Sequence, residues 1–118
     1  MEIQEQTILQ LSVPQAELFH SAVLEYLHRN IEAVLDYGLM DDIILNEYEA
    51  NVNKLARNDS SETEREQTKV NLASMLYSML LTAQGHIDEG TPYPIFLDFL
   101  MFVKESAFLL YFQSSGQA

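Results

Sequence analysis

The chain has 118 residues, with 6 Lys and Arg against 18 Asp and Glu, a formal net charge of −12, no Cys and 47% hydrophobic residues. One domain spanning residues 1–118 is expected at this length, and the apolar fraction is too high for a disordered chain. A chain without Cys has no disulfide framework, thiolate nucleophile or Cys-ligated metal centre. The acidic balance also disfavours direct binding to nucleic acid and to anionic membranes, since both need a basic patch.

Two stretches bear on targeting and location. The N-terminus is acidic at Glu2 and Glu5, where a signal peptide would be basic. The charge-free stretch of residues 70–87 contains several polar residues, so we interpret it as a buried helix and not as a membrane span. A cytoplasmic location is therefore expected.

Residues 7–13 alternate weakly between apolar and polar side chains. This pattern is compatible with a short strand, an extended arm or an added helical turn. A lone strand would leave its backbone polar groups without partners, so we favour the arm or the helical turn.

The first long helix is predicted over residues 14–37. Ser12 is a good N-cap, Pro14 suits the first turn and Gly38 is a good terminator. At 100° per residue, one side of this helix carries the apolar residues Phe19, Val23, Tyr26, Ala33, Val34 and Tyr37. The opposite side carries Glu17, Ser21, Glu25, His28, Glu32 and Asp36.

Two further helices are predicted over residues 42–57 and 62–84. Asp41 or Asp42 can cap the first of them, and Ser61 with Glu64 fits a capping box for the second. Gly85 is expected to end the second, which leaves residues 86–94 as a loop.

The last helix is predicted over residues 95–113. Its apolar side chains point in nearly every direction, so it must be central or covered by something else. The sequence therefore predicts an all-α fold, a compact four-helix bundle with a possible short extended N-terminal arm. Short linkers favour up-down neighbours among the first three helices.

Glu17-x-x-His20 and Glu25-x-x-His28 resemble half of a carboxylate di-metal site, which needs such a motif on each of two helices. Here both motifs lie on one helix, and three of the four residues fall on its polar side. We interpret them as a solvated face with two incidental histidines, and expect neither a metal nor a cofactor. Asp98, an acid within an apolar helix, is the remaining candidate for a perturbed acid–base group. The sequence shows neither a nucleophile motif nor a phosphate-binding glycine loop, so no enzymatic activity is expected.

The acidic side of the first two helices is a candidate partner-binding face made of Glu17, Glu25, Glu32, Asp36, Asp41, Asp42, Glu47 and Glu49. It is either a solvated face or a docking surface for a basic protein. A bolder interpretation is mimicry of the DNA backbone. The first four carboxylates are spaced roughly 12, 10 and 6 Å apart along the helix axis, more sparsely than DNA phosphates.

The last helix supplies a second candidate surface, formed by Phe96, Phe99, Phe102, Phe108, Tyr111 and Phe112. These side chains form either the core or an interface, in a homodimer or in a hetero-complex.

The leading hypothesis is a non-enzymatic interaction module that binds a basic partner protein and inhibits, neutralises or chaperones it, as immunity proteins, inhibitors and chaperones do. One alternative is a DNA-mimic inhibitor of a DNA-binding protein. A second is a metal- or small-molecule-binding helical-bundle enzyme that uses Glu17, His20, Glu25, His28 or Asp98. A third is a structural subunit of a homomeric assembly.

Overall fold

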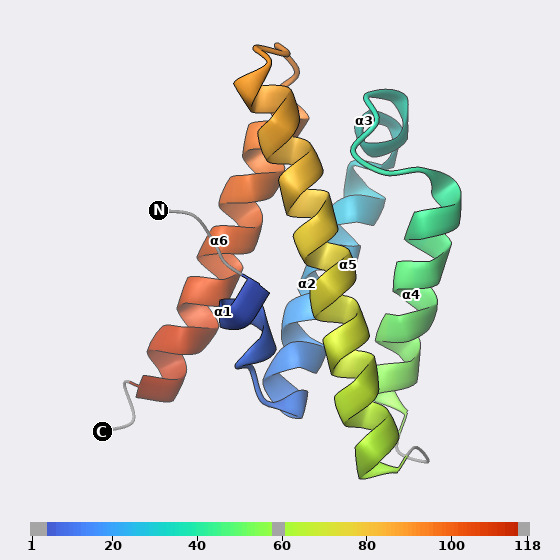
Figure 1. Ribbon diagram of the computed structural model, residues 1–118, viewed down its shortest axis with the longest axis vertical. Helices are drawn as coiled ribbons and strands as arrows, with labels where there is room; N and C mark the ends of the chain where they lie inside the picture. Colours follow the sequence, from blue (N-terminus) through green and yellow to red (C-terminus); the bar gives the residue numbers. More distant parts are fainter. Residues whose placement is uncertain (1–4, 58–60, 116–118) are drawn as a thin grey trace.

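Helices make up almost all of the backbone in the computed structural model, which describes residues 5–57 and 61–115 and the side chains of residues 6–57 and 61–110. In chain order they are α1 (Glu5–Leu9), α2 (Val13–Arg29), α3 (Ile31–Asp36), α4 (Asp42–Ala56), α5 (Glu62–Asp88) and α6 (Pro94–Ser115) (Figure 1). The described residues include no strand, so the prediction of an all-α fold is confirmed. The predicted count of four helices is not, because the described chain forms six helical segments.

The helix predicted over residues 14–37 is divided at Asn30 into α2 and α3. Asn30 leaves the helical region, with φ −116° and ψ 28°. Its side-chain amide donates to the Tyr26 carbonyl oxygen at 2.9 Å, and its backbone N–H donates to the same oxygen at 3.1 Å. Gly38 ends α3 as predicted, with a φ of 80° that a residue with a Cβ rarely adopts.

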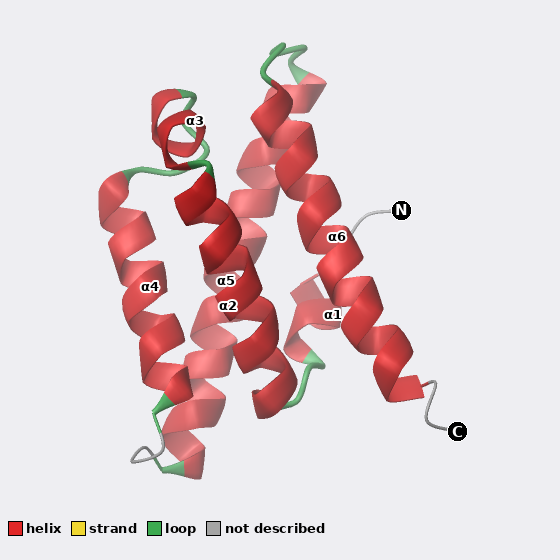
Figure 2. Cartoon of the chain, turned by 180° about the vertical axis from the view of Figure 1, so that it is seen from behind, coloured by secondary structure: helices red, strands yellow, loops and turns green. Residues whose placement is uncertain are grey.

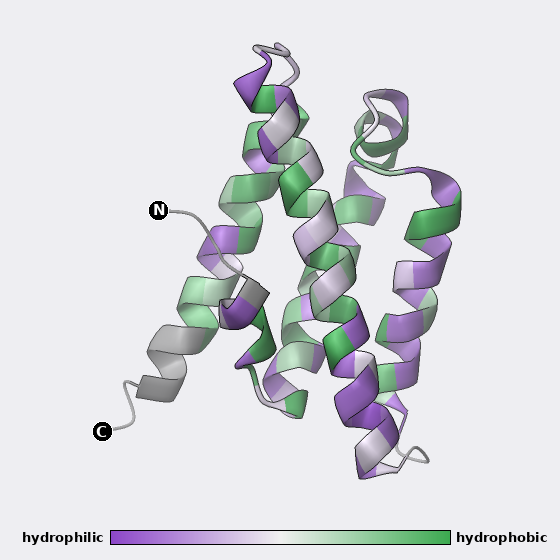
Figure 3. Cartoon of the chain, viewed as in Figure 1, coloured by the Kyte–Doolittle hydropathy of each residue, from purple (hydrophilic) through white to green (hydrophobic). Residues whose placement is uncertain are grey.

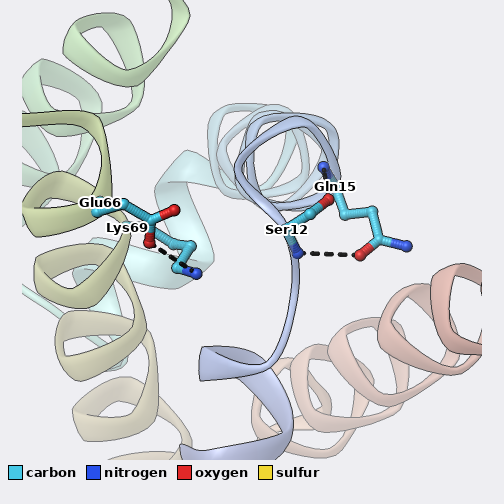
Figure 4. Close-up of polar contacts among 4 residues, drawn as sticks. All are labelled: Ser12, Gln15, Glu66 and Lys69. Carbon is cyan, nitrogen blue, oxygen red and sulfur yellow. Dashed lines mark hydrogen bonds and ion pairs between the residues drawn. The ribbon is translucent and has the colours of Figure 1, made fainter. Parts of the chain in front are cut away.

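The predicted N-caps are confirmed at three helices. Ser12 accepts a hydrogen bond from the Gln15 backbone N–H, and the Gln15 side chain accepts one from the Ser12 N–H, which completes a capping box (Figure 4). Asp41 accepts from the Ile44 N–H at 2.8 Å, and Ser61 accepts from the backbone N–H three residues on. These bonds satisfy donors that a helix start leaves unpaired.

The C-terminus of α5 corrects one prediction, because the helix passes through Gly85 and ends at Asp88. Gly90, at a φ of 80°, is the residue that reverses the chain. Its N–H donates to the Ile87 carbonyl at 2.9 Å, and the Thr91 N–H donates to the His86 carbonyl at 3.0 Å. This pair of bonds is a Schellman motif, which requires a left-handed residue at Gly90 and not at Gly85. The first part of the expected loop over residues 86–94 is therefore helical, and the connection to α6 follows Asp88.

The centre of the fold is α5, which packs against α1, α2, α4 and α6. Figures 1 and 2, drawn from opposite sides, show α4 on one side of it and α6 on the other. Helical spacing predicts a core stripe of Leu72, Met75, Leu76, Met79, Leu80 and Ala83, and all of these are buried except Met75, which is half-buried. Residues 7–13 do not form an extended arm: α1 packs on α5 and buries Ile8.

The last helix, α6, lies at the edge of the fold and not at its centre. Its described side chains are mostly apolar, whereas the first turns of α5 are hydrophilic (Figure 3). One face of α6 enters the core, while Leu97, Met101 and Leu109 are exposed. Within the described residues, no helix has both the length and the apolar character needed to cross a membrane.

Candidate interaction surface

His20 lies in the core, which corrects its interpretation as an incidental surface histidine. It is 0% exposed, and its Nδ1 lies 2.7 Å from the hydroxyl of Tyr48 on α4. Nε2 is buried without a hydrogen-bond partner. Burial lowers the pKa of His20 to about 3 and raises that of Tyr48. The imidazole is therefore neutral near pH 7, and the pair joins α2 to α4 through the core.

The other residues of the two Glu-x-x-His motifs point to different neighbours. Glu17 lies 3.9 Å from Arg65 on α5, and His28 lies 3.1 Å from Glu49 on α4. Glu25 is exposed on α2. The structure therefore does not bring the motifs together, and the described residues include no group of three His, Asp or Glu able to hold a metal ion.

Asp98, the candidate acid–base residue, is exposed on α6. It lies near Tyr26, whose pKa is raised to about 12 by burial first and by the negative charge of Asp98 second. Asp98 does not line the groove that lies between α4 and α5. Its environment is that of a surface carboxylate next to a half-buried phenol.

The strongest concentration of charge is the acidic segment, which we define as residues 30–53. It holds six carboxylates and no Lys or Arg. Five of the carboxylates are exposed and Glu49 is half-buried. Among the described residues, the contact of Glu49 with His28 is the one ion pair that this segment forms. The carboxylates are Glu32, Asp36, Asp41, Asp42, Glu47 and Glu49.

The sequence-predicted acidic face therefore divides in the structure. Six of its eight carboxylates fall in the acidic segment, on α3, the following loop and α4. Glu25 lies on the neighbouring α2, and Glu17 faces Arg65.

Four of the six cations lie at the opposite end of the molecule. Lys54 and Arg57 are at the end of α4, and Arg65 and Lys69 are in the first turns of α5. This end is far from α3 along the longest axis (Figure 1). Lys69 pairs with Glu66 at 3.0 Å (Figure 4). The cations therefore leave the charge of the acidic segment uncompensated.

A groove of about 250 Å³ lies between α5, the start of α4 and the loop that precedes it. Its buried floor includes Met40 and Met79, while Ile44 remains 41% exposed at its wall. Polar side chains stand at its mouth. The full lining is Leu39, Met40, Ile44, Glu47, Met75, Ser78, Met79 and Thr82. Half of this lining comes from the acidic segment, so an apolar floor and a carboxylate share one opening.

The aromatic residues of α6 separate into two sets. Phe96 and Phe99 are 0% exposed within this chain, so they belong to the core and are unavailable for the predicted interface. Phe102 is half-buried, with its ring 4.6 Å from that of Tyr26, and Phe108 is exposed. The side chains of Tyr111 and Phe112 lie outside the described residues.

A stacked pair of tyrosines connects the two loops at the α3 end of the molecule. Tyr37, after α3, and Tyr93, before α6, have ring centroids 4.0 Å apart and planes 13° apart. Next to them, His86 stacks on Phe96 at 4.3 Å. The Tyr37–Tyr93 stack therefore joins the loop after α3 to the α5–α6 connection.

Neither models of protein families, nor curated proteins, nor solved structures gave a match to this chain. Function is therefore inferred from the residues and their arrangement.

Sequence reasoning missed the groove and the His20–Tyr48 pair. The spacing of Met75 and Met79 predicted that both side chains lie in the core. Met79 is buried, but Met75 is half-buried and lines the groove with residues of α4. A signal was present for His20, which follows Phe19 toward the apolar side of its helix.

Proposed function

We propose that this chain is a non-enzymatic cytoplasmic interaction protein that binds a basic partner protein through the acidic segment and thereby inhibits, neutralises or chaperones it. The observation that carries the proposal is the uncompensated charge of residues 30–53. Six carboxylates occur there without a Lys or Arg, on α3, the following loop and α4. Such a field raises the rate of encounter with a basic surface and disfavours acidic partners.

The cost of this arrangement to the free chain also supports the proposal. Like charges gathered in one segment repel one another and destabilise the compact state. Spreading the six cations would reduce that repulsion, yet four of them lie at the other end. An opposing basic surface would relieve the repulsion on binding.

The test compares two charge-matched double variants in co-purification from the native host. Glu32→Gln with Glu47→Gln removes two charges from the acidic segment, while Glu62→Gln with Glu105→Gln removes two elsewhere. Glu32 and Glu62 both lie in the first turn of a helix, and Glu47 and Glu105 are both exposed in mid-helix. Extracts are treated with nuclease, and each complex is characterised by native mass.

We expect a basic protein to co-purify with the chain at a fixed stoichiometry. It should dissociate at ~0.5 M salt, because the salt limits electrostatic attraction to short distances. Its dissociation constant should rise about 2- to 30-fold for the first variant and little for the second, given ~0.2–1 kcal/mol for each of two exposed ion pairs. A partner that resists salt and binds both variants equally would contradict the proposal. Competition by DNA for that partner would indicate the DNA-mimic alternative.

A second candidate function is self-assembly through α6, as a subunit of a homomeric structure. Leu97 and Met101 are about half exposed and lie one turn apart on the same face, with Phe108 further along. Exposed apolar patches on one helix are typical of oligomer interfaces. Native mass of the purified chain tests this directly, and a monomer across the concentration range would exclude it.

A further inference from the structure

We propose that the groove between α4 and α5 receives one large apolar side chain from a basic amphipathic helix of the partner. This inference rests on the proposed function and names the point where the partner is anchored. The carboxylates around the groove would orient the helix, and the groove would hold it.

The size and lining of the groove suit one side chain. A closed cavity of ~150 Å³ holds a benzene ring, and pockets for drug-sized ligands begin near ~300 Å³. The groove, at about 250 Å³, lies between these values. Met40, Met75 and Met79 supply flexible, polarizable thioethers, which adapt to Leu, Met or Phe without a fixed shape.

The charge around the groove specifies a basic occupant. Glu47 stands in the lining itself, and Asp41 and Asp42 begin the helix that forms its wall. Ile43, next to them in the sequence, is a 73% exposed apolar side chain in the same turn. On an amphipathic helix, Lys or Arg three or four positions from an apolar anchor lies ~5–6 Å away. Seating the anchor therefore brings cations to the carboxylates at the mouth.

A second copy of this chain is a poor occupant. It would bring another net charge of −12 to the same opening. Residues 30–53 offer no Lys or Arg, and the four cations of residues 54–69 are matched by four carboxylates there, so neither end of a second copy presents net positive charge. Like charges brought together across an interface disfavour association, so a basic helix is the better complement.

The experiment uses the full chain with methyl-labelled methionine and a synthetic helical probe. The probe is a peptide of about 14 Leu and Lys residues, ~20 Å long as a helix, with Leu on one face. A peptide of the same composition with alternating Leu and Lys is the control. Methyl signals are assigned by single Met→Leu variants. Met40, Met75 and Met79 report on the groove, and Met101, on the far helix α6, is the internal reference.

We expect the helical probe to shift the three groove methyl signals and to leave Met101 unchanged. Thr82→Trp should fill the mouth of the groove and weaken binding at least about tenfold, the range for burying one large apolar side chain. Thr63→Trp, also an exposed Thr on α5, should bind like the natural chain. The methyl readout remains decisive if the Trp variant fails to fold.

Each contrary result has a distinct meaning. Binding that weakens in the Glu32 and Glu47 variant without groove shifts overturns the groove and keeps the proposed function. The methyl signals of the groove could shift equally in the two charge variants, or they could shift equally with an acidic Leu–Glu peptide. Either result would overturn both the basic occupant of the groove and the proposed function. Groove shifts caused by concentration alone assign the groove to self-association and overturn the proposal, as does the absence of binding.

Discussion

Lowering the pH from about 7 to about 5 should destabilise the folded chain by about 2 kcal/mol through His20 alone. Burial lowers the pKa of His20 from 6.5 to about 3, and the unfolded chain regains the ordinary value. The unfolded state therefore takes up the proton first, so stability falls as the pH drops below about 6.5 and the loss is complete near pH 3. At about pH 5, the pH is roughly 1.5 units below the pKa of His20 in the unfolded chain. Each of these units lowers the free energy of unfolding by about 1.36 kcal/mol, which gives about 2 kcal/mol.

The assay is urea unfolding followed by circular dichroism at constant ionic strength, for the natural chain and for His20→Asn. Asn offers Tyr48 a polar partner and does not titrate. Every other ionisable group is the same in both chains, so the remaining effects of pH cancel in the difference. The natural chain should lose about 2 kcal/mol more than the variant between the two pH values. Equal losses would show that the folded chain accepts a proton at this site, and would refute the assignment of a buried, neutral imidazole.

Three further predictions concern stability. Tyr48→Phe removes the hydroxyl that meets the buried imidazole at 2.7 Å and should cost ~1–3 kcal/mol in urea unfolding; a cost below ~0.5 kcal/mol would mean that the bond is unimportant. Gly90→Ala should destabilise by ~1 kcal/mol because of its φ of 80°, whereas Gly85→Ala, within α5 and with open space for a Cβ, should stabilise by ~0.5–1 kcal/mol. If both substitutions changed the free energy of unfolding in the same direction, the assignment of the helix end to Gly90 would be wrong. Raising NaCl from about 0.02 to about 0.2 M should raise the free energy of unfolding, less so after Glu32→Gln with Glu47→Gln; an equal rise would place the repulsion elsewhere.

Local patterns in the sequence predicted the helices well and their ends less well. Ser12, Asp41 and Ser61 cap as expected, because a cap depends on residues three positions apart. Gly85 failed as a terminator because a lone Gly is tolerated inside a helix whose neighbours are buried. Asn30 gave no strong sign of a break, because its bond to Tyr26 depends on a backbone geometry that the sequence does not specify.

The candidate site depends more on tertiary packing. The carboxylates of the acidic segment were evident from composition, since charge is local to the sequence. The groove was not, because Met40 and Met79 are brought together only when α4 docks on α5. His20 was assigned to the surface because the other three residues of the two motifs fall on the polar side of the helix, whereas His20 itself follows the buried Phe19 into the core. Its contact with Tyr48 joins residues 28 positions apart, beyond any periodicity argument.

The separation of charge between the two ends of the molecule has a consequence for orientation. Residues 54–69 hold four cations and four carboxylates, whereas residues 30–53 hold six carboxylates and no Lys or Arg, so negative charge is concentrated toward one end and the chain is an electric dipole as well as an anion. A positively charged surface exerts a torque on such a molecule as well as an attraction. The chain would therefore rotate during approach until the α3 end leads, which reduces the number of unproductive collisions. Within a Debye length of ~8 Å at physiological salt, this alignment would act only in the last steps before contact.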